Sequence, residues 1–120
     1  MVLALNDTDQ VAAVCRALVV SNSPHWSWGG GSWLFSSYGH TWYNHVHTPN
    51  SPLPDCACKA NLDSILDGNT SGAHTARSLH RGGVNVAFGD GATRFINGSI
   101  ELQVWRALGT EAGGETVANF

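Results

Sequence analysis

Charged residues are scarce in this chain of 120 residues. Lys, Arg, Asp and Glu together make up 12% of the sequence, and the net charge is −3. The six Lys and Arg residues are scattered rather than clustered. A surface that binds a phosphate backbone needs a dense group of positive charges. The sequence therefore predicts no nucleic-acid partner.

Long apolar runs are absent as well. No stretch approaches the ~20 apolar residues that are needed to span a bilayer. The N-terminus, MVLALNDTDQ, has neither the basic start nor the long apolar stretch of a signal peptide. As given, the chain is expected to be soluble, with no membrane segment and no targeting signal.

Glycine and aromatic residues take the place of the missing charges. The chain holds fourteen Gly and five Trp, and 42% of its residues are hydrophobic. Its length suits a single domain, so residues 1–120 are expected to share one core. A surface with few charges and many aromatic side chains tends to be covered by another subunit or a ligand. We therefore expect a homo-oligomer.

The pattern of apolar residues predicts an α+β fold, in the form of a small β-rich single domain. Residues 8–19 carry apolar side chains at helical spacing and predict an N-terminal helix. Val84, Val86 and Phe88 alternate with Asn85 and Ala87, and Asp90-Gly91 follows before residues 92–96. This pattern predicts a β-hairpin with an Asp-Gly turn that accepts positive φ angles. A short helix should follow this C-terminal β-hairpin.

The remaining segments give weaker signals. Ser99 can cap the short helix, which would run to Leu108 and end at Gly109. Segments rich in Pro, Gly, Asn and Ser predict loops, and aromatic or β-branched residues predict short strands. The predicted loops are 48–55 and 67–72, and the predicted strands lie within 21–43 and 115–118.

A longer pattern resembles a known family. The segments SLHRGGVNVAFGDG (78–91), RFI (94–96) and WRALGT (105–110) are similar to the C-terminal signature of the H-x9-D-G pseudopilin-like family, with His80 and Asp90 as the named pair. Upstream, WSWG (26–29), YNH (43–45), PNS (49–51) and PDC (54–56) resemble that family's middle region. The resemblance implies a globular head that an exported, membrane-anchored protein carries after a prepilin leader and a long apolar helix. This chain is expected to be the head without the leader and the helix.

Histidine and cysteine are frequent for so small a chain. His45-Val46-His47 and Cys56-Ala57-Cys58 would each place two ligands on one face of a strand, because side chains alternate along a strand. Zinc is held by three or four such ligands. The sequence therefore predicts a metal site, most simply for Zn, with the ligands His45, His47, Cys56, Cys58 and His80.

Structural alternatives stand beside each of these assignments. Cys56 can instead form a disulfide with Cys15, which would leave Cys58 as a free thiol. The histidines at 45 and 47 can hydrogen-bond to loop backbone, and His80 can be a buried imidazole that anchors the hairpin. About six extended residues separate His80 from Asp90, so Asp90 is expected to be a turn residue.

Two functions follow from these alternatives. A metal with an open position would polarise water and hydrolyse an activated ester or phosphoester, with Asp55 or Glu101 receiving the proton. Alternatively, the chain is a non-enzymatic structural head domain of a pilus-like or secretion-related assembly. An aromatic surface of low charge that packs against copies of itself would favour the second function.

Overall fold

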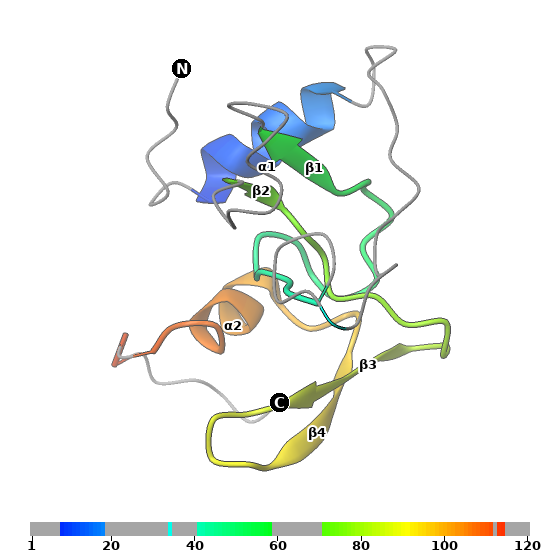
Figure 1. Cartoon of the computed structure of the whole chain (residues 1–120), viewed down its shortest axis with the longest axis vertical. Helices are drawn as coiled ribbons and strands as arrows, with labels where there is room; N and C mark the ends of the chain where they lie inside the picture. The colour runs from blue at the N-terminus through cyan, green and yellow to red at the C-terminus, as the bar shows by residue number, and fades with distance from the viewer. Residues whose placement is uncertain (1–7, 19–33, 35–40, 59–70, 112, 115–120) are drawn as a thin grey trace.

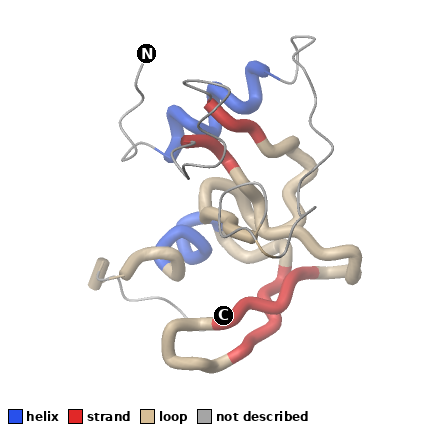
Figure 2. Tube along the Cα trace, viewed as in Figure 1, coloured by secondary structure: helices blue, strands red, loops and turns tan. Residues whose placement is uncertain are grey.

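The computed structural model describes residues 8–18, 34, 41–58, 71–111 and 113–114. Along this part of the chain the elements are α1 (Thr8–Leu18), β1 (Cys56–Cys58), β2 (Ser71–Ala73), β3 (Gly83–Ala87), β4 (Thr93–Asn97) and α2 (Leu102–Ala107) (Figures 1 and 2). The predicted α+β fold, with an N-terminal helix, a hairpin and a short helix after it, is confirmed. The strand predicted at 115–118 lies outside the described residues, as do most of 21–43.

Helix α1 forms where the apolar spacing predicted it. Val11 and Cys15, one helical turn apart, are buried on the same face. Asp9 lies in the first turn and Arg16 in the last, where their charges complement the helix dipole. Figure 1 shows α1 lying across the β1–β2 pair, at the end of the molecule opposite the β3–β4 hairpin.

The strands form two separate antiparallel pairs. In the first pair, Cys56 of β1 lies opposite Ala73 of β2. The last two residues of the predicted loop 67–72 were therefore assigned wrongly, since residues 71 and 72 belong to β2, while residues 67–70 lie outside the described part of the chain. Glycine and serine favour turns by local preference, but here the neighbouring strand β1 supplies main-chain partners for them.

The β3–β4 hairpin is confirmed, but its turn works differently from the prediction. Phe88 N–H donates to the Ala92 carbonyl, which leaves a three-residue loop instead of a two-residue turn. Only Gly91 in this loop has a positive φ, of 82°. Asp90 contributes through its side chain, since its Oδ1 accepts the Ala92 N–H at 2.8 Å.

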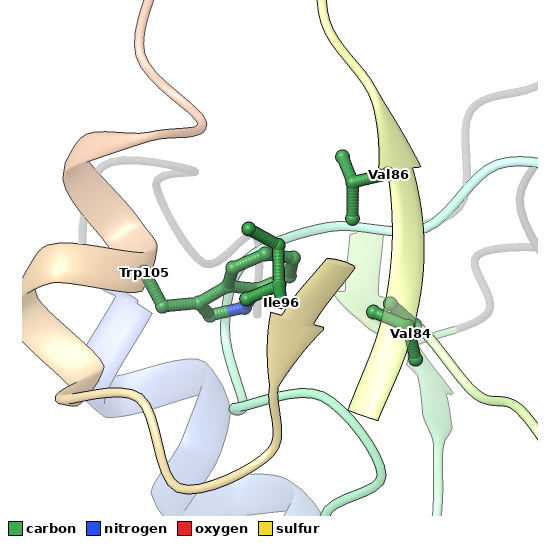
Figure 3. Packing of buried hydrophobic residues seen from close by; sticks show 5 residues of the cluster. Val84, Val86, Ile96 and Trp105 are labelled. Atoms are coloured by element: carbon green, nitrogen blue, oxygen red, sulfur yellow. The ribbon is translucent and has the colours of Figure 1, made fainter. Parts of the chain in front are cut away.

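Helix α2 closes the core of the hairpin. Trp105 is completely buried and packs on Val84, Val86 and Ile96 from the inner face of the hairpin (Figure 3). Leu102 and Leu108 line the same cluster, as the spacing of three residues predicted. We call the cluster of Ala76, Val84, Val86, Ile96 and Trp105 the hairpin core.

The cap of α2 was predicted wrongly. Glu101 occupies the cap position and makes no side-chain hydrogen bond to the helix. Ser99 instead bonds to the residue two positions before it: its N–H and its hydroxyl both donate to Asn97 Oδ1. This local bond competes with capping, as it often does for serine beside asparagine.

A second cluster lies under α1. Val11, Cys15, Val46 and Ala73 form it, with Cys56 at its margin. A disulfide joins Cys15 to Cys56 across this cluster, with their Cα atoms 5.5 Å apart and a sequence separation of 41. The disulfide alternative is therefore the one that the structure shows, and it ties α1 to β1.

A salt bridge also joins helices α1 and α2. Arg106 of α2 donates to Asp9 of α1 at 2.8 Å. Because the Asp9 side chain is 80% exposed, this pair contributes little to stability, on the order of 0–1 kcal/mol. Within the described residues, no helix is long and apolar enough to cross a membrane.

We predict that the disulfide dominates the stability of the α1 end. Replacing both Cys15 and Cys56 by Ser should lower the free energy of unfolding by about 2–4 kcal/mol, because the unfolded chain regains the freedom of a long loop. Urea denaturation of the variant and of the wild type in oxidised and reduced form measures this. If reduction leaves the wild-type midpoint unchanged, the prediction is wrong.

Candidate functional site

His45, the first predicted ligand, is stacked on Trp105 of α2. The ring centroids are 3.8 Å apart and the planes differ by 9°. Tyr43 stacks on the same imidazole, at 5.5 Å. His45 Nδ1 donates to the main-chain carbonyl of Trp105, since a carbonyl oxygen only accepts. Burial lowers the pKa of His45, an effect that this hydrogen bond partly opposes, so the ring is neutral near pH 7.

His47, the second predicted ligand, is buried at 6% exposure. Its main-chain carbonyl accepts the indole N–H of Trp105 at 2.8 Å. Its Nε2 is buried and has no hydrogen-bond partner among the described residues. Burial lowers the pKa of His47, although the nearby carboxylate of Asp55 opposes the shift.

These two histidines do not sit on a strand. Residues 45–47 form a bend, and Val46 between them is itself buried in the cluster under α1. The alternation that would have placed both imidazoles on one face is therefore absent. The predicted pairing of the two imidazoles required residues 45–47 to form a strand, and they do not.

The cysteine pair behaves differently. Residues 56–58 do form a strand, β1, but the Cys56 sulfur is bonded to Cys15. A disulfide sulfur has no thiolate to offer a metal, so Cys56 is excluded as a ligand while the disulfide is intact. The side chain of Cys58 lies outside the part that the structure describes.

His80 and Asp90 lie at opposite ends of β3, as predicted. His80 is exposed, and its N–H donates to the Ser78 hydroxyl at 3.1 Å. The alternative of a buried imidazole that anchors the hairpin is therefore wrong. Asp90 is a turn residue, as expected, through its bond to the Ala92 N–H.

Asp55 and Glu101, the two residues expected to accept a proton, have different surroundings. Asp55 Oδ1 accepts from the Thr75 N–H and from the guanidinium of Arg77, both at 3.0 Å. Glu101 is exposed at the start of α2. Across residues 8–18, 41–58 and 71–111, no group of three His, Cys, Asp or Glu side chains is arranged to hold a metal ion.

Two asparagines that the sequence reading passed over hold the centre of the domain together. Asn44 Nδ2 donates to the Gly72 carbonyl at 2.8 Å, and its Oδ1 accepts the His74 N–H at 3.2 Å. Asn50 Oδ1 accepts the Ser78 N–H at 2.7 Å, and its Nδ2 donates to the carbonyl of Gly83. Each amide side chain thus acts as a main-chain group would in a β-ladder.

Main-chain hydrogen bonds join the same two stretches of the chain. Asn44 N–H donates to the His74 carbonyl, and Asn50 N–H donates to the Ala76 carbonyl. We call the paired stretches 44–51 and 72–83 the central lacing. It joins the cluster under α1 to the hairpin core without forming regular strands.

Arg77, which lies in the central lacing, holds the proline-rich loop by hydrogen bonds. Its guanidinium donates to the main-chain carbonyls of Ser51 and Leu53 and to the carboxylate of Asp55. The loop predicted at 48–55 is confirmed, and Arg77 donates to two of its main-chain carbonyls, while its prolines have no N–H to donate to a ladder. No signal in the sequence near Arg77 indicates this role, since its partners lie 22–26 residues upstream.

His74 was not among the predicted site residues. It lies in the central lacing and is buried at 8% exposure. Burial lowers its pKa, and Asp55 opposes the shift, as it does for His47. The described part of the chain therefore contains three imidazoles whose pKa is lowered by burial.

The chain matches a known protein family. The model of a family described as a protein of unknown function (DUF1559) matches residues 5–103. No curated protein matches the chain, and no solved structure does.

We predict that Asn50 is required both for its bonds and for its backbone conformation. Its φ of 57° lies in the left-handed region, which Asn and Gly tolerate and Ala does not. Asn50→Ala should cost about 2–4 kcal/mol, from two lost hydrogen bonds and the strain of a positive φ. The matched control Asn50→Gly loses the same bonds without the strain, so it should cost about 1 kcal/mol less. Equal midpoints for the two variants in urea would contradict this account.

We also predict that the fold weakens below the ordinary pKa of histidine. His45, His47 and His74 have lowered pKa values when folded, so below about pH 6.5 the unfolded chain takes up protons that the folded chain does not. Stability is then fully present above pH 6.5 and is lost as the pH falls toward the folded pKa values. The slope is at most about 1.4 kcal/mol per pH unit for each histidine.

Urea denaturation at pH 7.5, 6.5 and 5.5 tests this slope. The window lies above the ordinary range of carboxyl groups, so histidine titration dominates it. His47→Gln should reduce the slope relative to the wild type. A wild-type stability that stays constant or rises from pH 6.5 to 5.5 would overturn the prediction.

Proposed function

Since the chain belongs to the DUF1559 family, a group of pilin- or pseudopilin-like proteins, we propose that it is a non-enzymatic structural head domain of a pilus-like or secretion-related assembly. In this role the domain presents a surface to neighbouring copies and carries out no reaction. Its folded shape, rather than a reactive group, is its functional property.

The proposal rests on the contacts made by three residues that were expected to bind a metal. His45 is a stacking ring on Trp105, the carbonyl of His47 accepts from the same indole, and Cys56 is in a disulfide. Each of these residues contributes to packing that holds two elements together. Side chains used in this way support a structural role more strongly than a reactive one.

The surface also supports this role. Large apolar side chains that are exposed by more than a third include Trp42, Tyr43, Leu79 and Phe95. Scattered exposed apolar residues are ordinary on a protein surface, and here they occur in a chain in which only 12% of the residues are charged. A head domain packed among copies of itself would cover such residues.

A metal-dependent hydrolase, the function that the His and Cys spacing first predicted, is the second candidate. One observation favours it, namely the buried His47 Nε2 without a hydrogen-bond partner among the described residues. A zinc ion would satisfy this lone pair. The Asp55 carboxylate acts electrostatically on both His47 and His74, but no three such side chains of the described residues are arranged to hold a metal ion.

Metal content and hydrolysis separate the two candidates. For the structural head we expect well below one zinc per chain in protein purified without an affinity tag, and no hydrolysis of activated esters or phosphoesters above a buffer blank. About one zinc per chain, with hydrolysis that is lost on chelation, lost in His47→Gln and restored by metal in the wild type, would establish the hydrolase instead.

The positive test of the structural role is the location of the protein in its source cells. An antibody raised against this chain should detect it in the filament fraction that mechanical shearing releases from the cell surface. The matched control is an abundant enzyme of the same cells, which should stay with the cell pellet. Detection of the chain only in the pellet would contradict the proposed assembly.

A further inference from the structure

Among the described residues, one edge of the β3–β4 hairpin has main-chain groups without a partner. Gly98 N–H donates to the Gly82 carbonyl, and Phe88 N–H donates to the Ala92 carbonyl, so these pairs are hydrogen-bonded across the hairpin. Bonded pairs alternate along an antiparallel ladder. Phe95 lies opposite Asn85 in a pair that is not hydrogen-bonded, as do residues 93 and 97 with their partners. The N–H and carbonyl groups of 93, 95 and 97 therefore point away from β3.

The two edges of the hairpin are not equivalent. On the β3 side, the Gly83 carbonyl already accepts from Asn50 of the central lacing. On the β4 side, the outward groups of Thr93 and Phe95 have no hydrogen-bond partner within the described residues. Only the Asn97 carbonyl is engaged there, by the Ile100 N–H at 3.1 Å. Figure 1 shows β4 as the strand at the outer end of the molecule.

The β4 edge carries only part of the usual protection. Free edges in soluble proteins are protected by charged side chains, especially Lys, by Pro, by short strands or by a bulge. The sequence of β4 is TRFIN, so the strand is short and has one charge, Arg94, whose guanidinium lies over the Phe88 ring. It has no Lys or Pro, and its register with β3 is continuous without a bulge. Phe95, in the middle of the strand, is 55% exposed.

We propose that the β4 edge pairs with the β4 edge of a second copy of this chain, antiparallel and centred on Phe95. The inference deepens the proposed function and rests on it for the choice of a second copy as the occupant. It names the surface through which heads meet. The pairing would join two hairpins into one sheet of four strands.

The sequence of β4 is complementary to itself in this register. Phe95 lies opposite Phe95 of the second copy, Thr93 opposite Asn97 of the second copy, and Arg94 opposite Ile96 of the second copy. No two like charges face each other, because the one cation of the strand is offset from the axis and opposes an apolar residue. Like charges directly opposite would disfavour the pairing, and aromatic pairs favour it.

The size of the contact sets its strength. Two edge strands of five residues bury far less than the roughly 1,200 Å² of a stable interface. The isolated domain should therefore associate weakly and reversibly. In an assembly that already holds many heads close together, a weak contact becomes effective because the local concentration is high.

The test is a matched pair of cysteine variants in a Cys58→Ser background, in which the introduced thiol is the sole cysteine outside the Cys15–Cys56 disulfide. Phe95→Cys places the thiol on the proposed axis, where the two Cα atoms would be about 5.5 Å apart, within the range of a disulfide. Asn85→Cys is the control, because Asn85 is exposed and directly opposite Phe95 but on β3. In the four-stranded sheet the two control positions would be about 14 Å apart.

The readout is the fraction of covalent dimer on a non-reducing gel after mild oxidation. We expect at least tenfold more dimer from Phe95→Cys than from Asn85→Cys. Adding Thr93→Pro, which removes an outward N–H, should lower the Phe95→Cys dimer several-fold while circular dichroism shows an unchanged monomer. Equal cross-linking of the two cysteine variants, or none from either, would overturn the inference. If the chain is nevertheless found in the sheared surface fraction, the proposed function stands and the heads meet through another surface.

Discussion

The structure depends most on the burial of one side chain, Trp105. Its indole fills the hairpin core and is completely inaccessible to solvent. The same residue holds the irregular stretch before the proline loop, through its indole N–H to the His47 carbonyl and through its own carbonyl to His45. A buried indole N–H needs a partner, so packing and hydrogen bonding fix α2 against two parts of the chain at once.

The central lacing shows how a domain with little regular structure satisfies its backbone. Its stretches pair through Asn44 and Asn50 rather than through a continuous ladder. An amide side chain offers one acceptor and two donor hydrogens, so it can replace a peptide group where the chain bends. The two hydrophobic clusters, under α1 and under the hairpin, are joined in this way rather than by one extended sheet.

This construction bears on how the histidines are to be interpreted. His45 and His47 lie where the chain bends around Trp105, and both are neutral because burial lowers their pKa values. A dense group of histidines indicates a metal site from sequence, but burial among aromatic rings is an equally good reason for a neutral imidazole. The β4 edge, which no other described strand pairs with and which carries the exposed Phe95, is then the feature that the core does not explain.

Local sequence determined the elements whose signal is periodic: the helix at 8–18, the hairpin around Asp90-Gly91 and the apolar face of α2. Spacing also allowed a disulfide between Cys15 and Cys56, but only the packing of α1 on β1 decided it against metal ligation. The lacing by Asn44 and Asn50, the engagement of Arg77 and the stacking of His45 were decided by tertiary structure alone. Their partners lie 22 to 60 residues away in sequence, and no local pattern encodes a contact whose geometry exists only after the chain has folded.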